Sequence, residues 1–490
     1  MSAVKFSVVI PTRERAETLR FALRTCLNQS FDDYEVIVSD NFSSPATRAV
    51  VEEAGSPKVR YVRTAEPVAM STNWEFAVSH ARGEYVILIG DDDALLPHAL
   101  TELDRLSRRP RGTKAIRWTP AYYTWPNVDL PGQGDYLRLP FGSTLFERDG
   151  HSTIREVASF REFYTALPML YNAAVHRDVL DDLRRRAGRV FPHPVPDVYS
   201  GFAIAHTAGT FLSTTVAMSV SGQSGSSNGI ATLFKRGRNA IDREFHALNA
   251  RAGLRSEPTV PDLPVFPHVP VADSFAFAKR TLFPDLPVDL DRRELAAACV
   301  AGARVAEADW PAALAVVRES LADVPELQKW FDAELAATPY RAPACVQLRP
   351  ACLGFDGTFL HLDASVFGAT DVAAAAQVCA QLLDYRDQPI EYAQSEDDRQ
   401  IAAMKIADLT YVCDERERAI LRLHLSSTEL RQTAHRLQSV CEEREEIIHR
   451  VETQARELNQ QLQEEQRWSL KRPLRAARRL LSSAVRRTPK

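Results

Sequence analysis

Residues 84–97, which read EYVILIGDDDALLP, constrain the fold of this chain more than any other stretch. A short apolar run over residues 85–89 is typical of a strand buried within a parallel sheet. Open α/β sheets bind their ligands in a crevice at the carboxyl ends of their strands. The run ends directly before three consecutive acids. We therefore expect a ligand site at Asp91, Asp92 and Asp93.

Three neighbouring carboxylates repel one another at close range, so the arrangement favours a compensating cation. Sites made only of oxygen donors suit Mg²⁺ or Mn²⁺, particularly when the ion is shared with a substrate phosphate. Aspartate is also common where helices begin, and a helix is expected near Pro97. From these residues alone, a metal site and an acidic turn before a helix both remain open.

The preceding part of the chain alternates strand and helix patterns. Apolar runs at residues 6–10, 34–38 and 59–62 predict strands, and helical spacing covers residues 15–28 and 71–80. This alternation predicts an α/β fold with a doubly wound, mostly parallel sheet. Because parallel strands end at the same edge, we expect one crevice to be lined by Thr12 with Arg13, by Asp40 and by the aspartates.

The segments VVIPTRER, EVIVSDNFSS and NWEFAVSHARGEYVILIGDDDALLP resemble the nucleotide-sugar-binding half of family 2 glycosyltransferases with the GT-A fold. The resemblance is close up to Pro97 and looser up to about residue 230. It implies a GT-A domain over residues 1–230, with the following residues in contact with the nucleotide sugar: Pro11, Thr12, Arg13, Asp40, Asn73, Asp91 and Asp92. It also implies a Mn²⁺ or Mg²⁺ ion held by Asp92 with help from Asp91 and Asp93.

Two positions depart from the family pattern. Gly90 stands where the family often carries Asp, and Ser39 precedes Asp40 where two acids are common. The carboxylate set is therefore incomplete, and Asp92 is expected to carry most of the metal binding.

In many inverting relatives an Asp that opens a helix across the crevice is the general base, and Asp197 matches it although Pro196 replaces the commoner Glu. The resemblance thus implies an inverting glycosyltransferase that moves a sugar from a nucleotide-diphosphate sugar to a saccharide or lipid-linked acceptor, in bacterial surface polysaccharide synthesis. The alternative is a catalytically impaired scaffold that acts through a coiled coil.

Two further segments leave alternatives open. The aromatic side chains in residues 118–140 could stack on a sugar ring or belong to the core; they are Tyr122, Tyr123 and Trp125. Residues 219–229, SVSGQSGSSNG, are rich in Gly and Ser and predict either a flexible lid over the donor or a plain linker.

The remainder of the chain divides into three predicted parts. Residues 231–392 predict a linker and a mainly helical accessory domain. Residues 396–466 contain leucines at seven-residue spacing, including Leu423, Leu430 and Leu437, which predicts a coiled coil and a homo-oligomer or a docking partner. Residues 467–490 contain many arginines and no acids, which predicts a basic amphipathic helix on an anionic membrane surface, with RNA binding or a disordered tail as alternatives.

Composition limits the remaining function classes. The net charge of −4 argues against a general nucleic-acid binder. The 7 cysteines have no metal-ligand spacing and suit reduced thiols, as in a cytoplasmic protein. No secretory signal and no apolar run of about 18 residues is evident. We therefore expect a cytoplasmic protein that associates peripherally with the inner face of the membrane.

Overall fold

The computed structural model describes residues 4–109, 113–227, 229, 240–343, 347–350, 353–384 and 391–392. All of them belong to one compact unit, Met1–Ala393. The predicted coiled coil at 396–466 and the basic helix at 467–490 lie outside the described residues. No helix in the described part of the chain is both long and apolar enough to cross a membrane.

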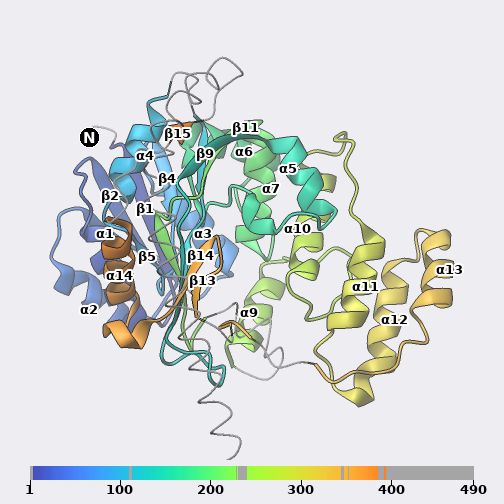
Figure 1. Ribbon diagram of the computed structural model, residues 1–490. Coiled ribbons are helices and arrows are strands. Elements are labelled where there is room, and N and C mark those ends of the chain that lie inside the picture. The colour runs from blue at the N-terminus through green and yellow to red at the C-terminus, as the bar shows by residue number, and fades with distance from the viewer. Residues whose placement is uncertain are drawn as a thin grey trace, which may run out of the picture. The chain divides into compact units, whose positions relative to one another are not determined.

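The first four strands of the unit, within residues 6–88, run parallel to one another, as predicted. Strand β1 (Phe6–Thr12) lies between β2 (Tyr34–Asp40) and β4 (Tyr85–Leu88), and β3 (Val59–Arg63) follows β2 at the edge. The connections carry the helices α1 (Ala16–Leu27), α2 (Pro45–Ala54) and α3 (Met70–Ser79). Figure 1 shows these elements together at the blue end of the chain.

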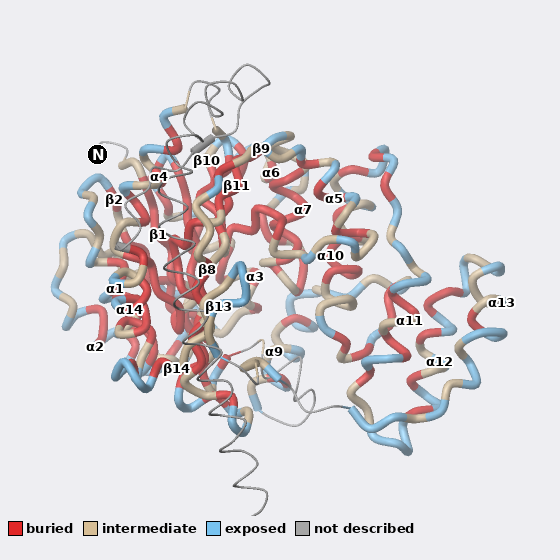
Figure 2. The backbone as a smooth tube through the Cα atoms, in the orientation of Figure 1, coloured by how far each residue is buried: buried red, intermediate tan, exposed pale blue. Residues whose placement is uncertain are grey.

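Alternate residues of β1 point to opposite faces of the sheet, as the strand period of two requires. Val8 and Ile10 belong to the core cluster that includes Leu19 of α1, whereas Val9 belongs to the cluster that includes Trp74 of α3. Helices therefore cover both faces of the sheet. Figure 2 shows the buried residues concentrated along these strands.

The same sheet continues as a mixed one, in the order β15-β9-β11-β6-β10-β4-β1-β2-β3. Strand β10 runs antiparallel to both β4 and β6, so the sheet is less parallel than the sequence predicted. The added strands are β6 (Ala115–Trp118), β9 (Thr144–Asp149), β10 (Ala173–His176), β11 (Thr210–Thr214) and β15 (Glu391–Tyr392). The helices associated with this half are α4 (Ala99–Ser107), α5 (Gly150–Ala158), α6 (Arg177–Ala187) and α7 (Pro196–Ala208).

A second sheet begins directly after the aspartates, in the order β13-β14-β8-β7-β12-β5. Its strands are β5 (Ala94–Leu95), β7 (Ala121–Thr124), β8 (Tyr136–Pro140), β12 (Ser219–Gln223), β13 (Gly354–Phe355) and β14 (Phe359–Asp363). Helix α14 (Val372–Asp384) packs on it, because Cys379 shares a buried cluster with Leu96 and Val220. Residues 353–384 therefore return to pack on elements that precede residue 230.

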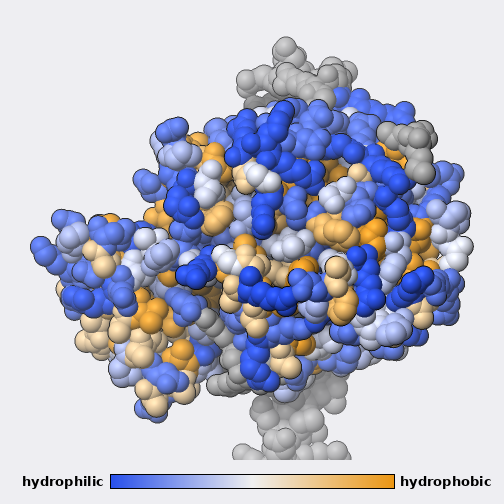
Figure 3. Space-filling model, turned by 180° about the vertical axis from the view of Figure 1, so that it is seen from behind, coloured by the Kyte–Doolittle hydropathy of each residue, from blue (hydrophilic) through white to orange (hydrophobic). Residues whose placement is uncertain are grey.

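Helices dominate the rest of the region that was predicted to be helical. They are α9 (Ala240–Arg251), α10 (His268–Thr281), α11 (Arg292–Gly302), α12 (Trp310–Ser320) and α13 (Pro325–Glu334). Phe275 of α10 packs against Phe202 of α7, with ring centroids 5.5 Å apart. Figure 3 shows a mostly hydrophilic surface from behind, with separate hydrophobic patches.

Candidate active site

The three aspartates follow β4 at the carboxyl edge of the parallel strands. Thr12 and Asp40 end β1 and β2 at this same edge, and the sheet register pairs them with each other. Asp91, Asp92 and Asp93 are each no more than 3% exposed. The predicted residues at the strand ends therefore meet in space, and their carboxylates are enclosed.

Asp91 joins β1 to β4. The Thr12 hydroxyl donates a hydrogen bond of 2.6 Å to Asp91 Oδ2, and Arg15 Nη1 lies 3.0 Å from Asp91 Oδ1. Asp92 instead faces the segment after β12, because Ser224 donates to Asp92 Oδ2 from its hydroxyl at 2.7 Å and from its main-chain nitrogen at 3.3 Å. The two acids thus connect elements far apart in the sequence.

Asp93 binds main-chain groups on both sides. The main-chain N–H groups of Gly90 and Gly222 donate to its two carboxylate oxygens, each at 2.7 Å. Tyr171 also donates a hydrogen bond to Asp93, and its ring stacks on Trp74 with centroids 5.9 Å apart. Asp93 therefore fixes β12 and Tyr171 against the loop that carries the acids.

The departure from the family pattern at Gly90 has a steric reason. A Cβ atom at this position would lie only 2.3 Å from the Tyr171 hydroxyl. An aspartate here would displace Tyr171 from its place beside Asp93. In this chain the Tyr171 hydroxyl occupies that space instead.

Burial and the charge of a neighbouring acid raise the pKa values of Asp92 and Asp93. Burial raises the pKa of Asp92, the charge of Arg15 opposes this rise, and the charge of Asp91 adds to it. Burial and the charge of Asp92 raise the pKa of Asp93 to about 7. Burial lowers the pKa of Arg15, but the charges of Asp91 and Asp92 outweigh it and the net pKa is raised. Further positive charge at this site would therefore favour the ionised carboxylates.

The aspartates differ in how well they suit a metal ion. Asp91 and Asp92 are adjacent hard oxygen donors, and with diphosphate oxygens they would make a suitable set for Mg²⁺ or Mn²⁺. Both oxygens of Asp93 accept main-chain hydrogen bonds, and both oxygens of Asp91 accept side-chain hydrogen bonds from Thr12 and Arg15, so Asp92 is the best suited of the three acids. Within the described ranges, no group of three or more His, Cys, Asp or Glu side chains is arranged to hold a metal ion.

Asp40 and Asn73, which were predicted to contact the nucleotide, point into the protein. Asp40 is 0% exposed; Ser43 N donates to its Oδ1 at 2.8 Å, and the Tyr61 hydroxyl donates to its Oδ2 at 2.5 Å. Asn73 is buried and accepts a hydrogen bond of 2.8 Å from the Ser39 hydroxyl. Both side chains therefore anchor the end of β2.

The other two predicted nucleotide contacts, Pro11 and Arg13, are partly exposed at the end of β1. Arg13 Nη1 donates a hydrogen bond of 2.7 Å to the main-chain oxygen of Asn41, and its Nη2 forms an ion pair with Glu244 of α9. Helix α9 thus contacts the crevice edge through a residue that no family motif covers.

Asp197 lies in the first turn of α7 and is partly exposed. Burial raises its pKa, while main-chain hydrogen bonds and the charge of His193 lower it. Ser200 links this turn to the sheet. Its hydroxyl donates a hydrogen bond of 2.7 Å to the main-chain oxygen of Asp197 and accepts one of 3.2 Å from Leu170 N. Leu170 in turn accepts a hydrogen bond of 3.1 Å from Leu88 N at the end of β4.

Two tyrosines relate Asp197 to the aspartates. Burial raises the pKa of Tyr122, and the charge of Asp92 contributes to that rise. Burial likewise raises the pKa of Tyr164, with contributions from Asp197 and from Tyr122. The charge of Asp92 thus acts on Tyr122, and the charge of Asp197 acts on Tyr164.

Among the aromatic residues left open by the sequence, Tyr123 and Trp125 belong to the core, being 0% and 5% exposed. Tyr122 is partly exposed. The interpretation of residues 219–229 as a lid or linker is wrong for Ser219–Gln223, which is β12 and pairs with β5 and β7. Gly222 lets β12 lie this close to the aspartate loop, since a Cβ there would lie 1.8 Å from the main-chain oxygen of Asp92.

Several residues of the site were not predicted. Arg15 lies within the VVIPTRER motif, and its charge beside the acids could have been suspected from the sequence. No sequence pattern marks the other three, which are Tyr171, Ser224 and Trp125. The Trp125 indole Nε1 donates a hydrogen bond of 3.0 Å to the main-chain oxygen of Asp92.

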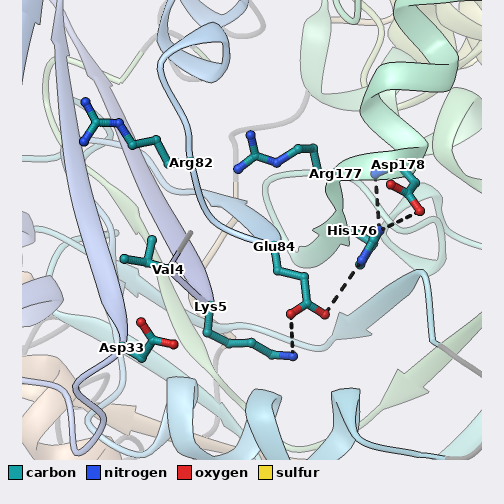
Figure 4. A pocket seen from close by; sticks show the side chains of 8 residues that line it. All are labelled: Val4, Lys5, Asp33, Arg82, Glu84, His176, Arg177 and Asp178. Atoms are coloured by element: carbon teal, nitrogen blue, oxygen red, sulfur yellow. Dashed lines mark hydrogen bonds and ion pairs between the residues drawn. The ribbon is translucent and has the colours of Figure 1, made fainter. Parts of the chain in front are cut away.

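A surface hollow of about 480 Å³ lies at the opposite edge of the sheet, beside the amino ends of β1 and β4. Figure 4 shows its charged lining, in which Glu84 lies between Lys5 and His176 at 3.0 and 3.7 Å. This hollow is therefore separate from the aspartate edge.

Comparison with known proteins gives a family assignment for part of the chain. Residues 7–122 match the model described as "Glycosyl transferase family 2". The GalNAc(5)-diNAcBac-PP-undecaprenol beta-1,3-glucosyltransferase of Campylobacter jejuni is 35% identical over 102 residues, which are 20% of this chain and 33% of that protein. Uncharacterized protein y4gI of Sinorhizobium fredii is 34% identical over 111 residues, which are 21% of this chain and 12% of that protein. The chain thus spans a third or less of these relatives' length.

Among solved structures, S. aureus TarS 1-349 in complex with UDP-GlcNAc is 15% identical, with 68% of this chain and 76% of that chain covered and a TM-score of 0.36. At that TM-score the likeness adds nothing to the assignment, which rests on sequence. Residues 7–122 of this chain are thus similar to the family 2 glycosyltransferases.

Proposed function

We propose that this protein is an inverting glycosyltransferase that moves a sugar from a nucleotide-diphosphate sugar to a saccharide or lipid-linked acceptor. The observation that carries the proposal is the enclosed edge formed by Thr12, Asp91 and Asp92 within the family-matched segment. The name of the C. jejuni relative contains a saccharide on diphospho-undecaprenol, which supports a lipid-linked acceptor and a role in surface polysaccharide synthesis.

In the proposed reaction, Asp197 accepts the proton of an acceptor hydroxyl. The oxygen of this hydroxyl forms a bond to the anomeric carbon as the bond from that carbon to the diphosphate oxygen breaks. The nucleoside diphosphate departs from the opposite face, so the anomeric configuration inverts. The partial burial of Asp197 suits the role, because a carboxylate with a raised pKa is a stronger base.

The charge that develops on the leaving diphosphate needs compensation. Arg15, held 3.0 Å from Asp91, supplies one fixed positive charge beside this edge. Asp92 with Asp91 would hold a Mg²⁺ or Mn²⁺ ion, whose chemistry when bound is to neutralise charge on the phosphate oxygens. Thr12 orients Asp91 for that purpose through its 2.6 Å hydrogen bond.

The location and assembly of the protein are also proposals. The 396–466 segment is proposed to form a coiled-coil homo-oligomer, and the 467–490 segment to bind the inner face of the cytoplasmic membrane. Analytical ultracentrifugation of the full chain tests the first, and a purely monomeric protein would contradict it. Vesicle flotation of the full chain beside residues 1–466 tests the second, and equal binding by both would remove the anchor role.

The experiment for the main proposal measures donor hydrolysis and sugar transfer with a panel of nucleotide sugars. Asp92→Asn should reduce turnover by roughly 100-fold or more while the circular dichroism spectrum stays unchanged. Asp32→Asn, on a fully exposed side chain, is the matched control and should remain active. Absence of turnover with every donor would favour the alternative, a catalytically impaired scaffold that acts through the coiled coil.

A further inference from the structure

Phe42 has an unusual backbone and an unusual exposure for its residue type. It follows the end of β2 by two residues, with a φ of 57°. Left-handed backbone disfavours bulky side chains, and at this position Gly or Asn would be the comfortable choice. The side chain is nevertheless aromatic and 41% exposed. Its retention costs both backbone strain and apolar exposure, and strained residues of this kind cluster at binding sites.

The neighbouring loop is strained in the same way and tied to the first. Glu14, just after β1, has a φ of 52°. Ser43 Oγ accepts from Glu14 N at 2.8 Å, and Glu14 Oε1 accepts from Ser44 N at 2.8 Å. These two loops follow the carboxyl ends of the adjacent parallel strands β1 and β2. The two hydrogen bonds between them hold both loops in their left-handed conformations.

Arg63 lies over the Phe42 ring. Its guanidinium lies 4.5 Å from the centroid of the Phe42 ring, and its Nη2 donates 2.8 Å to the Ser43 oxygen. Its Nε lies 3.5 Å from Asp40 Oδ2. The Arg63 side chain is 43% exposed, whereas that of Asp40 is 1% exposed. Phe42 and Arg63 therefore both face solvent, and the buried Asp40 carboxylate lies beside Arg63.

We infer that Phe42, supported by Arg63, is the platform on which the base of the donor nucleotide stacks. This inference rests on the proposed function and adds to it the residues that recognise the base. A heterocyclic base offers a flat π-face that suits the phenyl ring, and aromatic stacking is tolerant of base identity. The hydrogen bond of 2.9 Å from Asn41 N to the Thr12 oxygen joins this loop to the strand whose Thr12 binds Asp91, which places the platform beside the proposed diphosphate edge.

The test is isothermal titration calorimetry on the full chain with UDP, GDP and dTDP, and with inorganic pyrophosphate as a probe that lacks a base. Phe42→Gly should weaken binding of the preferred nucleoside diphosphate roughly 5- to 100-fold and leave pyrophosphate binding unchanged. Phe42→Asn, which accepts left-handed backbone without a ring, should behave likewise, and Phe42→Tyr should retain affinity. Phe367→Ala is the matched control, since Phe367 is 51% exposed and belongs to the short helix Ala364–Phe367 instead of the loops that follow β1 and β2.

Thermal unfolding separates this role from a structural one. Because glycine relieves the left-handed strain, Phe42→Gly should melt no lower than the wild type while it loses nucleotide affinity. Nucleotide binding by Phe42→Gly and Phe42→Asn equal to that of the wild type would overturn the platform and leave the proposed function intact. An equal loss of pyrophosphate affinity would also overturn it. A wild type that binds no nucleoside diphosphate would overturn both proposals.

Discussion

Gly222 is the position where a single methyl group should separate the second sheet from the aspartate loop. In Gly222→Ala, the new Cβ would lie 1.8 Å from the main-chain oxygen of Asp92 and 2.9 Å from Trp125 Nε1. Ordinary contact begins near 3.4 Å, so β12 has to withdraw by about 1.6 Å. This movement breaks the 2.7 Å hydrogen bond from Gly222 N to the Asp93 carboxylate.

The cost follows from these contacts. Loss of a buried hydrogen bond to a carboxylate is worth about 1.5–3 kcal/mol. Forcing an extra carbon into a close-packed interior costs about 1–3 kcal/mol more. We therefore expect Gly222→Ala to lower the free energy of unfolding by about 2.5–6 kcal/mol and to weaken donor binding, because Asp92 moves with the strand.

Urea denaturation followed by tryptophan fluorescence measures the effect on stability. Gly302→Ala is the matched control, because a Cβ there meets only a Val265 methyl group at 3.4 Å. That control should unfold close to the wild type. A Gly222→Ala protein that loses less than about 1 kcal/mol would show that β12 does not lie against Asp92 as described, and the site geometry would have to be revised.

Two further predictions concern the acids. Asp197→Asn should lower kcat roughly 100- to 10,000-fold with little change in KM for the donor. The wild-type rate should fall as pH drops through the raised pKa of Asp197. Steady-state kinetics across pH checks both, and a rate that does not change with pH would exclude Asp197 as the base. Because burial raises the pKa of Asp93 from an ordinary 3.8 to about 7, the folded state binds more protons than the unfolded one, so stability should fall as pH rises through this interval. Melting temperatures near pH 4 and pH 8 check this, and the same difference in Asp93→Asn would refute it.

The parallel part of the first sheet, β1 to β4, was predictable from the sequence, for a local reason. The runs that became β1, β2 and β4 are apolar and rich in β-branched residues, and helical spacing separates them. Because parallel strands share a direction, the residues that follow them had to meet at one edge. Asp197 was similarly found at the start of a helix from a nearby proline and the apolar pattern that follows.

The role of each acid could not be read in this way. Asp40 lies at the predicted edge, yet its carboxylate turns inward to Ser43 and Tyr61. The end of a strand places a residue at the edge of the sheet, but the direction of its side chain depends on the partners that other elements supply. The side chain of Phe42 is exposed at this edge, and no helical or strand periodicity in the sequence indicates this exposure.

What the sequence by itself determined is the order of strands and helices over residues 6–88 and the edge where the acids gather, because these depend on patterns a few residues long. Only the tertiary structure decided that Ser219–Gln223 is a buried strand, that Gly90 makes room for Tyr171, and that residues 353–384 complete the second sheet. The hydrogen bond between Asp93 and Gly222 spans 129 positions. Small residues such as Gly and Ser resemble a loop locally, and become a strand only when another part of the chain packs against them.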